Sequence, residues 1–433
     1  MKIDEASKIV LLEKILPVTG KIIHPIFTES DPQLPPNASK EEIQRYQLEK
    51  IREVAHLAYQ TPFYKKKFDE ARVNINKIRG IEDLKIRVTR KDLEKYENYM
   101  RKKNTKITFS AYTSGSSGNP IYISVSPKQF ISMLTSAEKP MKIVGISNKK
   151  KTLVLFPRLA PSYFAAVIGN SLTGYPFEVA DFFNLEDQIK KMKNTQVIIG
   201  YATRILNLIQ NCKDEDTKNL ENIIYSGESL PESGKEFIEK KTQAKVYGVY
   251  ATIEALGPIG VMCQKGNYHL IPELFSIEID KNKDILLTCL DPNRATILLR
   301  YEVGDKGEWT NCNCGITYPA FKVEGKFKHL TSQRIEAAIY ASQAFRDGHI
   351  SPYFDFEEKF EGGKRVFTVY LEKRNNEDLQ GIADEVQDII IHGNKKNLKP
   401  IKPLEVMIEG NMVDVQVKFK DGLNQKIKNP RFW

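Results

Sequence analysis

The stretch from Val197 to Lys241 decides the fold class, and it reads VIIGYATRILNLIQNCKDEDTKNLENIIYSGESLPESGKEFIEKK. Residues 197–200 and 222–225 are short runs rich in β-branched side chains, and turn residues bound each of them. Each run is followed by a helical pattern, over residues 203–212 and 231–241. Strands that alternate with helices predict a layered α/β domain with a buried sheet.

The same alternation extends outward over about residues 105–325, with a further apolar run at residues 153–156. Beyond Gly325 the pattern changes, and it predicts strands at residues 365–371, 404–408 and 413–417, a hairpin turn at 361–364 and a helix at 379–390. Because 433 residues are too many for one simple core, we expect two domains. We place a large N-terminal domain at residues 1–325 and a small α+β C-terminal domain at residues 326–433.

The N-terminal part of the chain predicts a leader and then a helix. Five prolines within the first 38 residues indicate a loosely structured leader. Ser39 followed by Glu42 is a capping box, in which each residue binds the backbone of the other. The apolar residues after it recur at spacings of three and four, and Thr61-Pro62 is expected to end the helix.

The composition is that of a globular protein. Hydrophobic residues make up 41% of the chain and charged residues 28%, inside the usual range. No apolar run approaches the roughly 20 residues that span a bilayer. Acidic residues at the N-terminus argue against a secretory signal. We therefore expect a cytoplasmic protein with no membrane partner.

The 65 lysines and arginines exceed the 55 aspartates and glutamates by ten. Such an excess is either a lysine-rich solvated surface or an attraction to polyanions such as ATP, coenzyme A or an acidic carrier protein. The sequence has no basic-aromatic RNA-binding signature and no zinc-finger helix spacing. We therefore expect no nucleic acid partner.

Residues 113–120 read TSGSSGNP and lie between two strand-like runs, 107–109 and 121–123. Two glycines let the backbone approach a ligand closely, and four hydroxyl side chains offer donors to phosphate oxygens. The run lacks the Gly-Lys-Ser/Thr of a Walker loop. Taken alone, it is either a phosphate-binding loop or a Ser/Gly-rich hairpin turn.

Three further motifs follow this loop in order: Ser226-Gly227-Glu228-Ser229-Leu230, Tyr250-Ala251-Thr252-Ile253-Glu254 and Arg300-Tyr301-Glu302-Val303-Gly304-Asp305. Together with TSGSSGNP they resemble the adenylate-forming superfamily of acyl-CoA synthetases, peptide-synthetase adenylation domains and luciferases. Thr61-Pro62-Phe63-Tyr64 and Ile81-Glu82-Asp83-Leu84 are similar to a narrower branch, the relatives of phenylacetate-CoA ligase and coenzyme F390 synthetase. The resemblance covers roughly residues 40 to 330.

The resemblance implies a role for each motif. Glu254 would bind Mg²⁺, a hard cation that prefers oxygen ligands, and Asp305 would accept hydrogen bonds from both ribose hydroxyls of ATP. Gly227 and Glu228 would lie along the adenine and acyl pocket, and Tyr250 would stack on the base. The residues expected to hold the β- and γ-phosphates are Thr113, Ser114, Gly115, Ser116, Ser117 and Gly118.

The chain departs from the family pattern in several places. Ala251 and Ile253 stand where the family usually has Gly and Ser or Thr. The hinge, usually Gly-Arg-x-Asp, reads Gly325-Lys326-Phe327-Lys328, so Lys326 keeps the positive charge and a lysine replaces the aspartate. The catalytic lysine of the C-terminal domain is usually in a Gly-Lys segment, for which Lys426 or Lys428 is the nearest match. We take Lys426 as the candidate.

A second set of residues indicates a metal site. The five cysteines are odd in number, and without a secretory signal they favour thiols or a metal over disulfides. Cys263-x5-His269 and Cys312-Asn313-Cys314 supply three sulfurs and one imidazole, a set that suits tetrahedral zinc. The resemblance implies that the two segments lie close together and that some relatives carry zinc there. Alternatively, Cys263 is a small buried residue and His269 a surface residue.

The resemblance also places Tyr163, Tyr201 and Leu256 near the segments that line the acyl pocket. Aromatic side chains suit a flat aryl acid, but at this density they also belong to an ordinary core. The identity of the acid is not predicted.

These observations predict an ATP- and Mg²⁺-dependent ligase with a structural zinc, present as a monomer or homodimer. It would convert a small carboxylic acid to an acyl-AMP, release pyrophosphate, and pass the acyl group to the thiol of coenzyme A or of a carrier protein's phosphopantetheine. The C-terminal domain would be mobile and close over the site. Two alternatives remain: transfer to an amine or hydroxyl, and a protein that binds its ligand without turnover.

Overall fold

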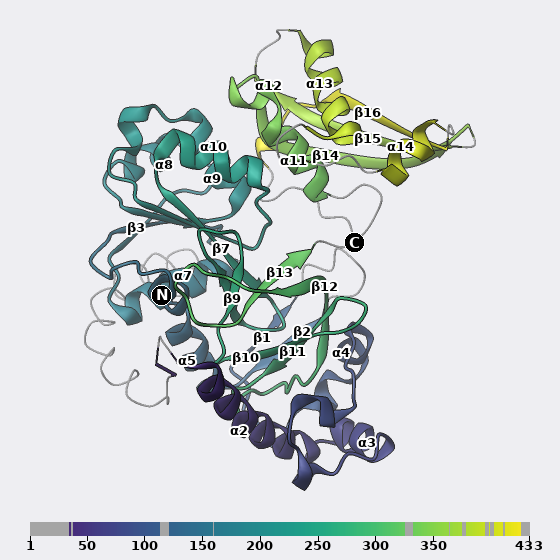
Figure 1. Cartoon of the computed structure of the whole chain (residues 1–433). Coiled ribbons are helices and arrows are strands. Elements are labelled where there is room, and N and C mark those ends of the chain that lie inside the picture. Colours follow the sequence, from purple (N-terminus) through teal and green to yellow (C-terminus); the bar gives the residue numbers. More distant parts are fainter. Residues whose placement is uncertain are drawn as a thin grey trace, which may run out of the picture. The chain divides into compact units, whose positions relative to one another are not determined.

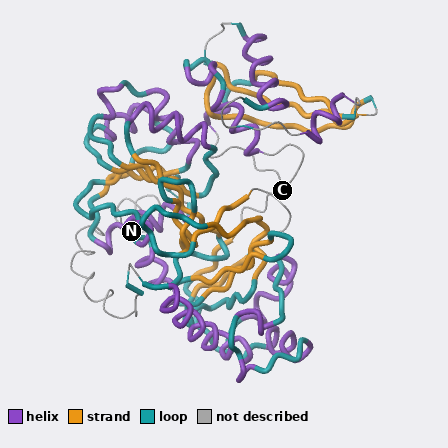
Figure 2. The backbone as a smooth tube through the Cα atoms, in the orientation of Figure 1, coloured by secondary structure: helices purple, strands orange, loops and turns teal. Residues whose placement is uncertain are grey.

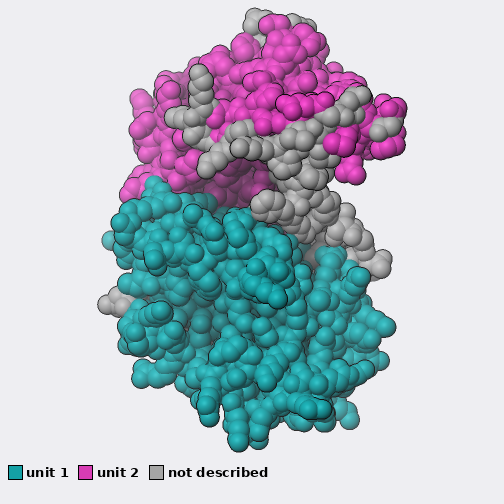
Figure 3. Space-filling view, turned by 45° about the vertical axis from the view of Figure 1, so that its right-hand side comes forward, with its two compact units in different colours: residues 1–149, 164–176, 249–324 teal, residues 150–163, 177–248, 325–433 magenta. Residues whose placement is uncertain are grey.

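The computed structural model describes residues 34–35, 38–112, 121–158, 160–324, 332–362, 364–374, 378–394, 398, 402–409 and 412–425. The chain divides into two compact units, which Figure 3 shows in different colours. Unit 1 comprises residues 1–149, 164–176 and 249–324, and unit 2 comprises residues 150–163, 177–248 and 325–433. Two elements, α7 (Pro161–Thr173) and β7 (Lys245–Thr252), contribute residues to both units. The single domain boundary predicted after residue 325 stays a prediction.

The first described helix of unit 1, α2 (Lys40–Tyr59), begins at the predicted capping box. The Glu42 amide donates to Ser39 Oγ (3.1 Å), and the Ser39 amide donates to Glu42 Oε2 (2.7 Å). After the helix ends, Thr61 becomes the N-cap and Pro62 the first residue of α3 (Pro62–Glu70), because proline at that position loses no helical hydrogen bond. The predicted helix and its end are confirmed. The other helices of unit 1 are η1 (Ile75–Lys77), η2 (Ile81–Leu84), α4 (Arg90–Tyr96), η3 (Glu97–Met100), α5 (Pro127–Ser136) and α6 (Lys139–Ile143).

Unit 1 is built on an antiparallel sheet, in the strand order β10-β11-β12-β13-β9-β8-β7. Buried side chains of this sheet, such as Ile259, Leu287 and Phe321, share one core with α2, α3 and α4. A separate antiparallel hairpin pairs β1 (Phe109–Tyr112) with β2 (Tyr122–Val125). The remaining strands are β8 (Gly257–Met262), β9 (Tyr268–Leu270), β10 (Phe275–Ile279), β11 (Asp284–Cys289), β12 (Tyr301–Thr310) and β13 (Ala320–Glu324).

Unit 2 contains the predicted layered α/β structure (Figure 1). Strands β4, β3, β5 and β6 pair in parallel, and the first residues of β7 lie beside β6. Its strands are β3 (Thr152–Leu155), β4 (Phe177–Val179), β5 (Val197–Gly200) and β6 (Asn222–Ser226). The helices between them are α8 (Leu185–Met192), α9 (Ala202–Asn211), η4 (Asp214–Thr217) and α10 (Glu232–Thr242). The strands and helices predicted between residues 197 and 241 are therefore confirmed.

The C-terminal part of unit 2 is a small α+β structure, as predicted, with a three-stranded sheet in the order β14-β15-β16. Figure 2 shows helices beside this sheet. Strand β15 pairs antiparallel with β14 and parallel with β16. Its elements are α11 (Ser332–Ala341), α12 (Gln343–Arg346), β14 (Ile350–Glu361), β15 (Lys364–Lys373), α13 (Leu379–His392), α14 (Lys402–Glu409), β16 (Val413–Phe419) and η5 (Leu423–Gln425).

One predicted strand of this part is wrong. Residues 404–408 lie in the helix α14, with Leu404 fully buried. A short apolar run is compatible with a strand or with a buried helix. Pro403 precedes the run, and proline is well tolerated in the first turn of a helix.

Within unit 2, residues 345–374 contact the helix α9. The Gln210 side-chain amide donates to the carbonyl oxygens of Phe345 (2.7 Å) and Ile350 (2.9 Å). Arg374 donates to the side-chain oxygen of Asn207 at 2.8 Å. The mobility that we predicted for the C-terminal domain stays a prediction.

No helix among the described residues is long and apolar enough to cross a membrane. The predicted leader falls almost wholly outside the residues that the structure describes.

Candidate active site

Two motifs with the same internal spacing come together in unit 1. Tyr250 lies near the end of β7 and Glu254 in the turn that follows, whereas Tyr301 begins β12 and Asp305 lies within it. Each motif thus has a tyrosine followed, four positions later, by a carboxylate. Since β8, β9 and β13 separate β7 from β12 in the strand order, contact between the two motifs requires the sheet to curl.

The two motifs exchange hydrogen bonds crosswise. The Tyr250 hydroxyl donates to Asp305 Oδ2 at 2.8 Å, and the Tyr301 hydroxyl donates to Glu254 Oε1 at 3.0 Å. Each tyrosine therefore binds the carboxylate of the other motif. The predicted Mg²⁺ ligand Glu254 and the predicted ribose ligand Asp305 are each held by a neutral donor of the same unit.

The electrostatics keep both phenols protonated. Burial, followed by the nearby Asp305 carboxylate, raises the pKa of Tyr250 well above its usual value. Burial, followed by the Glu254 carboxylate, raises the pKa of Tyr301 in the same way. Because a phenol beside a carboxylate resists ionising, both tyrosines act as hydrogen-bond donors.

Arg294 holds the backbone on which Glu254 lies. Its guanidinium donates to the carbonyl oxygens of Glu254 (2.6 Å) and Ala255 (2.7 Å), and its Nε donates to the carbonyl oxygen of Thr296 (3.3 Å). Only 4% of Arg294 is exposed. A buried cation with carbonyl partners satisfies the orphan acceptors of the turn between β7 and β8.

The backbone is strained at both motifs. Leu256 (φ 55°) and Arg300 (φ 48°) adopt the left-handed conformation, which is uncommon for residues other than glycine. Gly304 (φ 85°) takes the same region without that cost and directly precedes Asp305. Such strain persists only where the surrounding structure enforces it, and it concentrates at functional sites.

In unit 2, Gly227 and Glu228 lie after β6, as the sequence predicts. Gly227 has φ 76°, a value that explains glycine there. The Glu228 carboxylate is buried and accepts from the Thr203 amide at 2.8 Å. Thr203 lies in the first turn of α9, whose N-cap Tyr201 offers no side-chain acceptor. Glu228 therefore supplies the negative group that a helix N-terminus favours.

The three residues predicted to line the acyl pocket lie in different units. Tyr163 and Tyr201 are buried in unit 2, where the Tyr201 hydroxyl lies 3.2 Å from Ser162 Oγ and its ring meets the edge of Phe156. Leu256 is partly buried against the core of unit 1.

The predicted phosphate loop, with Thr113, Ser114, Gly115, Ser116, Ser117 and Gly118, lies outside the described residues, as do Lys326 and Lys426. The strands that flank the loop are described. Tyr112 pairs with Tyr122, so β1 and β2 form an antiparallel hairpin with this loop between them.

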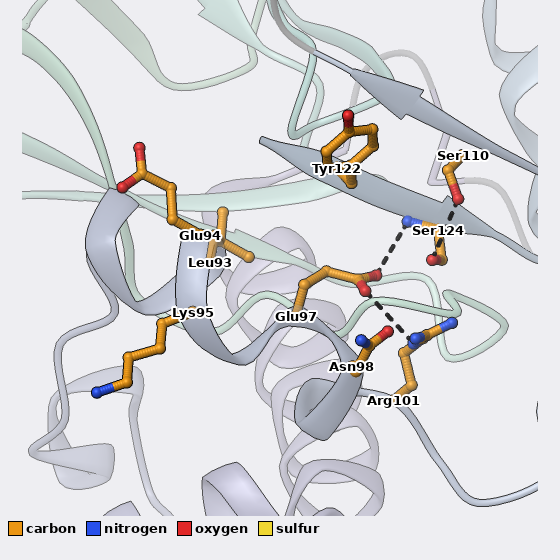
Figure 4. A pocket seen from close by; sticks show the side chains of 9 residues that line it. All are labelled: Leu93, Glu94, Lys95, Glu97, Asn98, Arg101, Ser110, Tyr122 and Ser124. Carbon is orange, nitrogen blue, oxygen red and sulfur yellow. Dashed lines mark hydrogen bonds and ion pairs between the residues drawn. The ribbon is translucent and has the colours of Figure 1, made fainter. Parts of the chain in front are cut away.

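A polar cavity of about 310 Å³ lies beside this hairpin (Figure 4). The hairpin lines it with Ser110 of β1 and with Tyr122 and Ser124 of β2. On the other side it is lined by Glu97 of η3 and by Arg101, which follows η3. The Ser124 amide donates to Glu97 Oε1 at 3.1 Å, and this bond ties β2 to η3. None of the residues that we predicted to bind nucleotide or acid lines this cavity.

The predicted metal ligands also come together in unit 1. Cys263 follows β8 and His269 lies in β9, whereas Cys312 and Cys314 lie between β12 and β13. Because Ala320 of β13 pairs with His269, the two segments meet. The four ligand atoms all lie within 4.8 Å of one another. Cys263 Sγ is 3.6 Å from Cys312 Sγ, and Cys314 Sγ is 3.2 Å from His269 Nε2.

His269 is fully buried, so the alternative interpretation as a surface residue is wrong. Its Nδ1 lies 2.8 Å from the carbonyl oxygen of Tyr318. A carbonyl only accepts, so Nδ1 carries the proton and Nε2 presents its lone pair to the three thiols. Metal-binding histidines have this same second hydrogen bond.

The thiols of the cluster differ in acidity. Burial opposes ionisation of Cys312, but hydrogen bonds within the cluster, that of the Asn267 side chain foremost, lower its pKa to about 6. Burial and the neighbouring thiols raise the pKa of Cys314 to about 11. A cluster of three thiols and one imidazole thus fits a soft or borderline cation such as zinc.

Comparison with solved structures identifies the fold. The chain has the fold of the adenylate-forming acyl-CoA ligases, with a large α/β part and a C-terminal α+β part. One similar structure is a 2-hydroxyisobutyryl-CoA ligase in the postadenylation state, in complex with 2-HIB-AMP. The match covers 91% of this chain and 89% of the ligase, with 16% sequence identity and a TM-score of 0.67.

Two further ligases have the same fold. A benzoate-CoA ligase from Burkholderia xenovorans LB400 matches 75% of this chain over 67% of its own, with 14% identity and a TM-score of 0.52. For the anthranilate-CoA ligase AuaEII, in complex with anthranoyl-AMP, the match covers 75% of this chain and 66% of the ligase, with 10% sequence identity and a TM-score of 0.52. No family model and no curated protein matches the chain. At these identities the likeness establishes the fold.

Sequence reasoning missed two residues of the site. Tyr301 was part of a quoted motif without a role, and Arg294 was not singled out. The equal spacing of Tyr250 to Glu254 and of Tyr301 to Asp305 was the available signal for Tyr301. Nothing in the sequence around Arg294 predicts its contacts with the turn.

Proposed function

We propose that this protein activates a carboxylic acid with ATP, forming an acyl-adenylate and pyrophosphate, and then transfers the acyl group to a thiol of coenzyme A or a carrier protein. The observation that supports the proposal is the pair of crossed tyrosine–carboxylate contacts that join the Glu254 motif to the Asp305 motif, in the fold of acyl-CoA ligases. Two carboxylates fixed by neutral donors suit a site for a cation and a sugar hydroxyl.

The residues take the following roles. Glu254, fixed through one of its oxygens, supplies a hard oxygen ligand for Mg²⁺. That cation, when bound, neutralises charge on the triphosphate as pyrophosphate leaves. Asp305 binds the ribose, and Gly227 and Glu228 lie along the base. The loop at 113–118 and Lys326 hold the phosphates, and Lys426 stabilises the charge that develops at the α-phosphate.

We propose an aryl acid as the substrate. This assignment rests on the aromatic character of Tyr163 and Tyr201, together with Leu256. The benzoate and anthranilate ligases of the same fold act on such acids by name.

The Cys263, His269, Cys312 and Cys314 cluster is proposed to hold a structural zinc ion. All four ligand atoms lie within 4.8 Å, and four protein ligands leave no open position for catalysis. When bound, the ion would join the loop after β8 to the loop after β12 and so support β8, which follows the turn with Glu254, and β12, which carries Asp305.

A protein that binds its ligand without turnover is the second candidate. Lys328, which replaces the usual hinge aspartate, is the feature that favours it. Acyl transfer to an amine is a third outcome, since the acceptor is not determined by the residues that bind ATP.

Pyrophosphate release tests the proposal. The protein is incubated with Mg²⁺-ATP and a panel of aryl and aliphatic acids, with and without coenzyme A. We expect acid-dependent pyrophosphate, and an acyl-CoA product where the thiol is the acceptor. Tight binding of an acid without pyrophosphate would favour the second candidate. Product formed only with an added amine would identify the third.

A further inference from the structure

We propose that Tyr301 and Tyr250 are positioning residues: through the crossed hydrogen bonds, Tyr301 sets the orientation of the Glu254 carboxylate and Tyr250 sets that of the Asp305 carboxylate. The inference rests on the proposed roles of Glu254 and Asp305. It gives Tyr301 and Tyr250 a task that the sequence did not predict.

The two motifs contribute the same groups to the contact. Each motif contributes one phenol and one carboxylate, and each phenol occupies one oxygen of the opposite motif, Oδ2 of Asp305 and Oε1 of Glu254. A hydrogen bond to one oxygen fixes the rotation of a carboxylate about its terminal bond, which is otherwise soft. Because each carboxylate has its own phenol, loss of one hydroxyl frees the rotation of one carboxylate and leaves the other held.

Tyr301 is anchored more firmly than the Glu254 carboxylate that it binds. Only 1% of Tyr301 is exposed. The preceding residue, Arg300, is held in its left-handed conformation by two contacts with Glu278, at 2.8 and 3.1 Å. The following residue, Glu302, accepts from Arg87 at 2.9 Å. With both neighbours tied, Tyr301 acts as the fixed point and Glu254 as the group that is oriented.

Tyr250 is anchored by ring packing. Its ring lies 5.9 Å from the ring of Tyr268 and 6.1 Å from the ring of Phe321, which come from β9 and β13. These two contacts limit the swing of the phenol, so its hydroxyl has a defined direction. The Asp305 carboxylate that it binds follows Gly304, whose φ of 85° is easy for glycine alone.

Arg294 serves the same turn through a different group. It binds the backbone carbonyls of Glu254 and Ala255, whereas Tyr301 binds the carboxylate itself. Loss of Arg294 would therefore disturb the fold of the turn, and loss of the Tyr301 hydroxyl would free the side chain of Glu254 in a turn that stays folded. This difference makes Tyr301 the residue whose positioning role is separable from stability.

The experiment compares Tyr301→Phe and Tyr250→Phe with wild type by calorimetric titration of Mg²⁺ and of ATP. Removal of a hydrogen bond to a charged group costs enough to change an affinity about tenfold. We expect Tyr301→Phe to raise the half-saturating Mg²⁺ concentration about tenfold, with a much smaller change in ATP affinity at saturating Mg²⁺. Tyr250→Phe should weaken ATP about tenfold and leave the Mg²⁺ dependence close to wild type.

Tyr64→Phe is the matched control. Tyr64 is a fully buried tyrosine of the same unit, and its hydroxyl donates to the Ile297 carbonyl oxygen at 2.9 Å. Its variant should lower stability and leave both titrations unchanged. Equal weakening of Mg²⁺ and ATP by all three variants would assign the tyrosines a structural role only and overturn the inference.

A double-mutant cycle on stability separates this inference from the proposed function. Tyr301→Phe, Glu254→Ala and the double variant are unfolded in urea without ligand. Non-additive effects would support the coupling even if wild type bound no ATP, in which case the proposed function alone would fail. Additive effects would overturn the pairing of Tyr301 with Glu254, whatever reaction the protein performs.

Discussion

The hydroxyl of Tyr250 donates to the carboxylate of Asp305 at 2.8 Å, across 55 positions of sequence. The sequence had predicted separate roles for the two residues, with Tyr250 on the adenine and Asp305 on the ribose. Their contact relates the two predicted roles, because the phenol that fixes the Asp305 carboxylate also has a defined position relative to any nucleotide that Asp305 binds. The proposed site is therefore organised by side chains of unit 1 before any ligand arrives.

Replacing Asp305 with alanine is expected to abolish tight ATP binding together with activity. The ribose hydroxyls would lose their acceptor, and the Tyr250 hydroxyl would lose its partner, at a cost of about 2 kcal/mol or more. Calorimetry with Mg²⁺-ATP measures the loss. Asp69→Ala, which removes an exposed aspartate paired with Lys65, is the control and should bind ATP as wild type does. Unchanged affinity in Asp305→Ala would mean that the ribose role is misassigned.

Glu254→Gln keeps the shape of the side chain and removes its charge. Tyr301 can still donate to the amide oxygen, so the melting temperature should change little. Loss of a metal ligand is worth several kcal/mol of transition-state stabilisation, so pyrophosphate exchange should fall by about 100-fold or more. Glu273→Gln, at a carboxylate paired with Lys139, serves as the control. Exchange near the wild-type rate in Glu254→Gln would remove Glu254 as the metal ligand.

The thiol and imidazole cluster predicts about one zinc per chain in protein purified without chelator, measured by elemental analysis. Cys312→Ser should lose the metal and lower the melting temperature, since metal affinity contributes folding free energy. Cys212→Ser, at a buried thiol bonded to the Ile209 carbonyl oxygen, should retain the metal. Metal-free wild-type protein with the same stability before and after chelator treatment would refute this site and leave the proposed reaction untouched.

The contacts of Arg87 predict that its contribution to the stability of the fold depends on pH. It donates to Asp280 (2.7 Å), Asp284 (2.8 Å) and Glu302 (2.9 Å). Burial opposes ionisation of Asp280, but Arg87 and the backbone amides of Asp284 and Asn282 lower its pKa below the usual value. A carboxyl with a lowered folded-state pKa stabilises the fold above its unfolded pKa, about 3.9, and loses that contribution as the pH falls through its folded pKa.

Arg87→Met should therefore cost on the order of 1 kcal/mol at pH 7, a modest figure because the group is partly exposed and screened by salt. The difference from wild type should shrink as the pH falls below about 4. Urea unfolding across this range measures it. A difference that is the same at pH 7 and pH 3 would show that Arg87 contributes by packing rather than by charge.

The parts of the fold that the sequence predicted are those set by local periodicity. The β5-α9-β6-α10 segment carries its strands as apolar runs and its helices as spaced apolar positions, and both survive in the structure. The strand predicted at residues 404–408 was wrong, because the periodicity of a short apolar run does not distinguish a strand from a buried helix. The antiparallel sheet of unit 1 was not predicted. Most of its pairings join strands that follow one another in the chain, but the pairing of β9 with β13, which sets the strand order, joins segments distant in sequence.

The sequence predicted some residues of the candidate site and missed others. Cys263, His269, Cys312 and Cys314 were grouped by ligand type, and the pairing of β9 with β13 brings them together. Glu254 and Asp305 were found through their motifs. The contact between Tyr301 and Glu254 spans 47 positions and exists only because the sheet curls, so residue spacing alone does not predict it.

Isotope transfer tests the central claim, the formation of an acyl-adenylate, most directly. An acid that supports pyrophosphate release is supplied with both carboxylate oxygens labelled with ¹⁸O, together with Mg²⁺-ATP and coenzyme A. If the carboxylate attacks the α-phosphorus and the thiol then displaces AMP, one labelled oxygen leaves with the nucleotide. The account predicts AMP that carries one ¹⁸O by mass spectrometry. Unlabelled AMP, or label in inorganic phosphate beside ADP, would contradict it.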